Sequence, residues 1–156
     1  MDIGTLCFLI RDERIVLAMK KQGFGKGKWN GYGGKIKDQD EGDINLTAIR
    51  ETKEESDLEI RHARRNLRAI ITFYFGGEPG FKVYVFLVYD WFGEPRETSE
   101  MKPKWFDLDQ IPYNQMWVAD KEWLPLILAG QRIKAEVFFD QFGKKLEKFD
   151  YQEMKS

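Results

Sequence analysis

The chain alternates short apolar and aromatic runs, which are typical of β-strands, with two stretches that have the ends expected of helices. Strands are expected at residues 3–10, 15–20, 69–75, 81–91, 104–108, 132–139 and 145–151. The first helix is expected to begin at Asp43 or Asn45 and to end near Ser56, and the second to cover residues 120–129. Strands and helices interleaved in this way predict an α/β (α+β) fold, with a mixed central β-sheet and helices on both faces.

The composition predicts one compact domain over residues 1–156, because 42% hydrophobic residues can fill a sizeable core. A net charge of −1 provides no general attraction to nucleic acid, so we expect no nucleic-acid partner. We also expect a monomer. Cys7 is the only cysteine and cannot form an intrachain disulfide, which favours a reduced, cytoplasmic location. No apolar run has the length of a membrane span, so no membrane partner is expected.

Three carboxylates fall within five residues in the run Arg50-Glu51-Thr52-Lys53-Glu54-Glu55. In a helix, Glu51 lies one turn before both Glu54 and Glu55, so the three side chains share one face. Carboxylates crowded on one face repel each other unless a cation lies among them, and hard oxygen ligands suit Mg²⁺ or Mn²⁺. A solvated acidic helix face explains the spacing equally well.

A longer pattern distinguishes these two interpretations. Gly34 followed by Arg50, Glu51, Glu54, Glu55 and Leu58 resembles the Nudix box, G-x5-E-x7-R-E-U-x-E-E-x-G-U, of Mg²⁺-dependent hydrolases that act on nucleoside diphosphates linked to another group. The resemblance implies the Nudix α/β/α sandwich. It also implies that Mg²⁺, for which Mn²⁺ can substitute, is held by Glu51, Glu54, Glu55 and Glu100 with the backbone carbonyl of Gly33. Arg50 would orient one box carboxylate, and one carboxylate would act as general base.

The chain departs from the box at three places. Counts from its two ends disagree by two residues, which indicates an insertion and leaves Asp40, Glu41 or Asp43 as the substitute for the first Glu. Thr52 replaces an aliphatic residue that should pack inward. Asp57 replaces the Gly expected at the helix end, where Asp tolerates a left-handed backbone better than most residues. None of these changes removes a carboxylate from the shared face.

Segment 19–35, which contains the glycine-rich loop 21–31, resembles the MutT-like members of the Nudix family. The later segments 100–103, 105–106, 108–112, 116–117 and 123–128 continue the resemblance in the same order. Those enzymes hydrolyse oxidised purine nucleoside triphosphates, which sanitises the nucleotide pool. The likeness covers nearly the whole chain. It implies a nucleoside triphosphate substrate, with 8-oxo-dGTP or 2-hydroxy-dATP as the leading candidates, and release of pyrophosphate and a monophosphate.

The same resemblance implies a set of substrate-binding residues. They are Thr5, Lys20, Phe24, Asn30, Tyr32, Gly34, Lys35, Phe73, Phe75, Trp117, Ala119 and Asp120. Asn30, Trp117 and Asp120 would recognise the base, since an indole can stack on a purine. Where the resembling enzymes carry two consecutive Asp residues, this chain has Ala119 before Asp120, so one acceptor is missing and the preferred base can differ. Lys20 and Lys35 would contact phosphates, although each could also be a solvated lysine at a strand end.

Two other functions fit parts of the sequence. A Nudix pyrophosphatase for nucleotide sugars or ADP-ribose would share the metal-binding helix and differ in the pocket. A non-enzymatic module that binds nucleic acid would need the basic cluster at residues 61–68, which includes the sole histidine, His62. A solvated connection after the helix explains that cluster more simply.

Overall fold

The structure is a computed structural model that describes residues 1–61 and 66–154. Its strands are β1 (Asp2–Arg11), β2 (Arg14–Lys20), β3 (Trp29–Asn30), β4 (Glu59–Ile60), β5 (Leu67–Phe75), β6 (Glu78–Val88), β7 (Trp91–Phe92), β8 (Met101–Asp107), β9 (Ile133–Phe139) and β10 (Leu146–Glu153). Its helices are α1 (Ile44–Ser56) and α2 (Asp120–Leu128), with 3-10 turns η1 (Asp38–Asp40) and η3 (Tyr113–Gln115). None of the described helices has the length and apolar character needed to cross a membrane.

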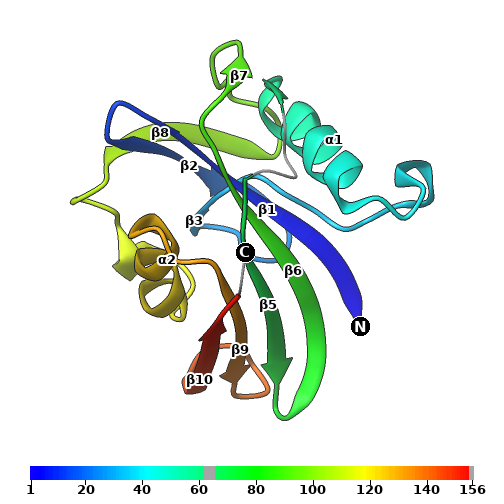
Figure 1. The fold of residues 1–156 in the computed structure, drawn as a ribbon, viewed down its shortest axis with the longest axis vertical. Coiled ribbons are helices and arrows are strands. Elements are labelled where there is room, and N and C mark those ends of the chain that lie inside the picture. Colours follow the sequence, from blue (N-terminus) through cyan, green and yellow to red (C-terminus); the bar gives the residue numbers. More distant parts are fainter. Residues whose placement is uncertain (62–65, 155–156) are drawn as a thin grey trace.

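Eight strands form one mixed sheet in the order β10-β9-β5-β6-β1-β2-β3, with β8 paired to β2 (Figure 1). The pairs β1–β6 and β5–β9 are parallel, whereas β1–β2, β2–β3, β2–β8, β5–β6 and β9–β10 are antiparallel. β4 and β7 form a separate two-stranded sheet. The two helices cover opposite faces of the large sheet, which confirms the predicted mixed sheet between helices (Figure 1).

Two hydrophobic clusters explain why the helices lie on opposite faces. Phe8 and Ile10 of β1 join the cluster under α2, which contains Trp123. Cys7 and Leu9 point the other way, into the cluster that contains residues of α1. Because both faces of β1 are buried, its sequence is a continuous apolar run and not an alternating one. Burial also raises the pKa of the Cys7 thiol to about 12.

Helix α1 begins and ends where its sequence predicts. The Asp43 side chain accepts a hydrogen bond from the backbone N–H of Asn45 at 2.9 Å and caps the helix. Asp57 ends it in the left-handed conformation, with φ of 65°, and donates its N–H to the carbonyl of Lys53 at 2.9 Å. Asp57 therefore takes the role that glycine has in the Nudix box.

Candidate active site

The loop before η1 approaches the acidic face of α1 through two glycines. The Gly33 N–H donates to Glu55 Oε1 at 2.8 Å. A Cβ at Gly34 would lie within 2.7 Å of both carboxylate oxygens of Glu51, and a Cβ at Gly33 would overlap the Thr5 carbonyl. Both positions therefore require glycine: Gly34 because the Glu51 carboxylate approaches its backbone, and Gly33 because the backbone of Thr5 does.

Arg50 connects η1 to the carboxylates of α1. Its Nε and NH2 donate to the two carboxylate oxygens of Asp40 at 2.8 and 2.9 Å, a bidentate pair, and its NH1 donates to Glu51 Oε1 at 2.7 Å. The hydrogen bond from Arg50 is the largest of the interactions that hold the pKa of Asp40 well below its usual range. Of the three acids that could replace the first Glu of the box, Asp40 is thus the one that contacts Arg50.

The other two acids have different positions. Asp43 caps α1, as described above. Glu41 is exposed and ends η1 with φ of 53°. Asp40, in contrast, is buried and also accepts from Thr47 Oγ1 at 2.8 Å and from the Lys37 N–H at 2.9 Å. These two contacts hold its carboxylate in place for Arg50.

Glu55 is the carboxylate most affected by its surroundings. Its pKa is raised to about 8, first by burial and then by the negative charges of Glu51 and Glu100, while the Gly33 N–H and Lys20 lower it. Glu100 lies outside α1, and its negative charge nevertheless acts on Glu55. Repulsion among these three carboxylates is the situation that a bound cation relieves.

The loop that carries Glu100 is docked on α1 by Thr98. The Thr98 hydroxyl donates to the backbone carbonyl of Glu55 at 3.1 Å and accepts from the Glu100 N–H at 3.2 Å. The Lys21 N–H donates to the carbonyl of Glu100 at 2.9 Å. Sequence reasoning did not find Thr98, because its contact with α1 spans 43 residues.

The donor set of this cluster fits a hard divalent cation, since it consists of carboxylate and backbone carbonyl oxygens. Among the residues that the structure describes, no three acidic, histidine or cysteine side chains converge in the arrangement of a metal site. The carboxylates have other partners: Glu51 bonds to Arg50 and Glu55 bonds to Gly33. Glu54 is half exposed, at 49%, with Arg50 NH1 3.3 Å away.

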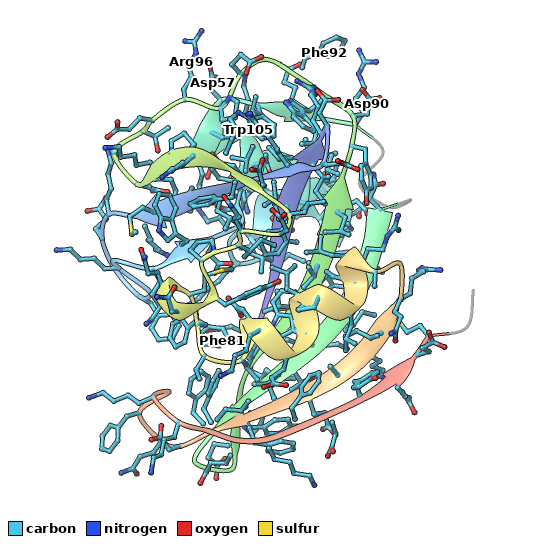
Figure 2. The ribbon with its side chains drawn as sticks, turned by 90° about the vertical axis from the view of Figure 1, so that its left-hand side faces the viewer. Asp57, Phe81, Asp90, Phe92, Arg96 and Trp105 are labelled. Carbon is cyan, nitrogen blue, oxygen red and sulfur yellow. The ribbon has the colours of Figure 1, made fainter. Side chains whose placement is uncertain are left out.

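A cavity of about 320 Å³ opens beside the glycine pair. It is lined by Gly4, Thr5, Leu6, Lys20, Phe24, Gly25, Lys28, Asn30, Gly31, Gly33, Gly34, Lys35, Glu55, Phe73, Phe75, Phe81, Val83, Met101, Trp117, Asp120, Trp123 and Phe139. One part of this lining is charged and glycine-rich, around Glu55 and Lys20, and the other is aromatic. In Figure 2, Phe81, a residue of the cavity lining, lies in the lower half of the molecule, whereas Trp105 and Phe92 lie toward the upper end.

Aromatic rings form much of the cavity lining. The rings of Phe24 and Trp117 have centroids 4.9 Å apart, and Phe24 also lies 5.6 Å from Phe81 and 6.5 Å from Phe75. Despite these contacts, Phe24 is 61% exposed. It therefore lies at the mouth of the cavity and presents apolar surface to an entering ligand.

Two polar side chains face this apolar wall. Asp120, the first residue of α2, is buried, and its Oδ2 has no hydrogen-bond partner. Burial raises the pKa of Asp120 to about 7, although nearby Trp123, Trp117 and Lys28 lower it. Asn30 Oδ1 accepts from the Gly31 N–H at 2.8 Å, so its amide NH₂ group remains to donate.

Tyr32 and Ala119, both predicted to contact substrate, are not among the residues that line this cavity. Tyr32 is fully buried in the cluster under α1, because its backbone pairs with Cys7 of β1 and its ring packs into the core. Ala119 is fully buried in the cluster under α2. The other predicted substrate-binding residues all line the cavity.

Several cavity residues were not found from the sequence. They are Lys28, Phe81, Met101, Trp123 and Phe139, together with Gly4 and Leu6 of β1, Val83 of β6, and Gly25 and Gly31. They come from separate elements, so no local spacing connects them. Lys28 had one signal, its place in the basic glycine-rich loop. Of the basic cluster at 61–68, residues 62–65, including His62, lie outside the described residues.

The chain resembles known proteins over most of its length. A family model of the NUDIX domain matches residues 2–127. Oxidized purine nucleoside triphosphate hydrolases of Danio rerio and Mus musculus are 43% and 41% identical to it over 131 and 129 residues, covering 82% of this chain and 80% of each relative. The crystal structure of a MutT protein from Bacillus halodurans has the same fold, with a TM-score of 0.83 and 20% identity, covering 97% of this chain and 98% of that chain.

Proposed function

Since this chain belongs to the Nudix family of hydrolases, we propose that it hydrolyses oxidised purine nucleoside triphosphates to the monophosphate and pyrophosphate. One observation carries the proposal: a single cavity joins Glu55 and the Gly33-Gly34 pair to an aromatic wall with the buried acid Asp120. Phosphates and a base can therefore contact the protein at the same time. The identity to enzymes with this named activity supports the same substrate class.

The residues around Glu55 suit the phosphate end of such a substrate. We assign Mg²⁺ to Glu51, Glu54, Glu55, Glu100 and the Gly33 carbonyl; when bound, it would neutralise phosphate charge and lower the pKa of the attacking water. Arg50, itself held by Asp40, keeps Glu51 in position. Lys20 lies where its charge acts on Glu55, which suits it to contact a phosphate.

The reaction itself is a substitution at phosphorus. Water attacks the α-phosphorus, the bond from that phosphorus to the bridging oxygen breaks, and pyrophosphate leaves with that oxygen. One of the clustered carboxylates takes the proton of the water, and we leave open which one, because they titrate together. Substitution of the carboxylates should therefore abolish hydrolysis, while the affinity of the pocket for the base is retained.

The aromatic wall suits the base. Trp117 and Phe24 provide ring surfaces for stacking, and Asn30 and Asp120 provide the polar contacts. With Ala119 in the core, base selection depends on Asp120 and its neighbours and not on two adjacent acids. We also propose that the protein acts as a monomer in the cytoplasm, where its single, buried thiol would stay reduced.

Product analysis tests the proposal. The protein is incubated with Mg²⁺ and, separately, with 8-oxo-dGTP, 2-hydroxy-dATP, ADP-ribose and a nucleotide sugar. We expect pyrophosphate and a monophosphate from the triphosphates and little turnover of the other two compounds. Efficient cleavage of ADP-ribose or the sugar nucleotide, with inert triphosphates, would assign the site to another nucleotide class.

A further inference from the structure

Lys28 is a cationic side chain in the cavity wall that the proposed reaction does not use. It is half-buried, immediately before β3, and its Nζ lies 5.3 Å from the centroid of the Trp117 ring. Its backbone is fixed on both sides, since its N–H donates to the Gly25 carbonyl at 3.1 Å and its carbonyl accepts from the Lys20 N–H at 3.2 Å. None of the ion pairs found within residues 1–61 and 66–154 involves it.

Lys28 lies over the ring on which a base is proposed to stack. Its ammonium is 5.3 Å from the centroid of the Trp117 ring, and Phe24 contacts the same ring, so a base stacked on this indole would lie close to the ammonium. Binding would move the ammonium to an edge of the base. The positive charge also acts on Asp120, whose Oδ2 lacks a hydrogen-bond partner. A cation and an acid are therefore both available to the base in the same cavity.

The chemistry of the ammonium restricts which edge it can contact. Lys has three donors and no acceptor. In an 8-oxopurine N7 carries a hydrogen and donates, so position 6 distinguishes the bases on this edge: a 6-oxo base has the acceptor O6 there, whereas a 6-amino base has a donor. An ammonium near this edge is therefore satisfied by the first kind of base and opposed by the second.

We propose that Lys28 is a specificity-determining residue that favours purines with a carbonyl at position 6 over purines with an amino group there. This inference rests on the proposed function of the cavity as a purine site. It assigns the leading substrate to the 8-oxoguanine type and not to the 2-hydroxyadenine type. The Asp120 carboxyl then remains for the other edge of the base.

Binding of reaction products tests this role separately from turnover. Isothermal titration calorimetry would measure the affinities of 8-oxo-dIMP and 8-oxo-dAMP, which differ at position 6 and in the proton on N1. We expect the wild type to bind 8-oxo-dIMP at least about tenfold more tightly, the effect of one charge-assisted hydrogen bond. Lys28→Met should reduce the ratio to about one, whereas Lys28→Arg should preserve it. Lys26→Met is the matched control, because Lys26 is an exposed lysine of the same loop outside the cavity lining.

The outcomes separate this role from the proposed function. The role of Lys28 would be refuted if the ratio of the two affinities were the same in Lys28→Met as in the wild type. It would also be refuted if the wild type bound 8-oxo-dIMP and 8-oxo-dAMP equally tightly. If Lys28→Met does not fold, Lys28→Gln decides in the same way. Preference for 8-oxo-dIMP that depends on Lys28, in a protein that hydrolyses no triphosphate, would support the role of Lys28 and refute the proposed reaction. Binding of neither nucleotide would refute both.

Discussion

Arg50 and Asp40 form a two-bonded ion pair that is almost withdrawn from water: the Nε–Oδ1 and NH2–Oδ2 distances are 2.8 and 2.9 Å, and the side chains are 13% and 2% exposed. The third guanidinium nitrogen, NH1, donates to Glu51. Arg50 therefore connects the short turn η1 to the carboxylate face of α1. The position of Glu51 depends on an acid that lies ten residues before Arg50.

Asp40→Asn should destabilise the protein by about 3 kcal/mol, because it leaves the Arg50 guanidinium buried with one charge partner fewer. Urea unfolding would measure the change, with the exposed Asp38→Asn as control. Because the folded-state pKa of Asp40 is lowered, its contribution is complete above the unfolded value of about 3.9 and is lost as pH falls below it. The difference between wild type and variant should therefore shrink in acid. An equal difference at pH 3 and pH 7 would contradict this account.

Gly34→Ala and Gly33→Ala should fail in different ways. At Gly34 the new methyl group meets the Glu51 carboxylate, a side-chain end that can turn away, so we expect lost activity with a stability loss of about 1 kcal/mol. At Gly33 it overlaps the Thr5 backbone, and we expect a loss above about 3 kcal/mol. Activity and urea unfolding, measured on both variants, check the contrast; equal stabilities would show that the backbone approach at Gly33 is less tight than described.

Glu55→Gln should lower kcat by about 100-fold or more, the usual effect of losing a group that handles the proton or the metal. Its stability should be unchanged near neutral pH and increased above pH 8, because the amide stays neutral where ionisation of the buried Glu55 carboxyl, whose pKa is about 8, is opposed by burial and by Glu51 and Glu100. Glu59→Gln, an exposed acid on β4, is the control for both measurements. Retained activity in Glu55→Gln would remove the carboxylate cluster from the mechanism.

Mg²⁺ or Mn²⁺ should stabilise the folded protein independently of turnover. At a concentration of 100 times its dissociation constant, a cation bound only to the folded state adds about 2.7 kcal/mol. Thermal unfolding of the wild type should therefore shift upward with added cation, and the shift should be smaller in Glu55→Gln. Chelation should stop hydrolysis. A shift of the same size in both proteins would place the cation elsewhere.

Asp120 should make stability depend on pH in the opposite sense to Asp40. Its pKa is raised by burial to about 7, so the folded state keeps a proton that the unfolded state, with a pKa of about 3.9, has released. Its contribution to stability therefore decreases as pH rises from about 4 to 7. Asp120→Asn should gain stability relative to the wild type over this window. Urea unfolding at pH 5 and pH 8 measures the gain, with the exposed Asp109→Asn as control.

The sequence predicts the long elements well because their patterns are local. Both ends of α1 follow from Asp43 and Asp57, which contact their own helix. The strands β3, β4 and β7 have two residues each and show no periodicity to detect. The connection between the strands expected at 69–75 and 81–91 is shorter in the structure: Gly76 and Gly77 form it, with φ of 58° and 85°. Gly80 belongs to β6, where a Cβ would lie 2.8 Å from the Phe75 ring.

The site was predictable only where one segment contains it. The carboxylates of α1 and the glycine pair lie in a local motif. The choice of Asp40 over Glu41 and Asp43, the docking role of Thr98 and the place of Lys28 over Trp117 depend on contacts between distant segments. Tyr32 and Ala119 are each adjacent in sequence to a cavity residue, yet both are buried in the hydrophobic clusters and do not line the cavity.

The most direct test of the central claim is the ratio of kcat/KM for 8-oxo-dGTP to that for dGTP, measured with Mg²⁺ and with pyrophosphate identified as product. We expect pyrophosphate from both and a ratio of at least about ten, because a pocket selective for oxidised purines must distinguish the 8-oxo base, which has a carbonyl at C8 and a hydrogen on N7, from guanine. Equal values for the two nucleotides, or orthophosphate as the product, would contradict it.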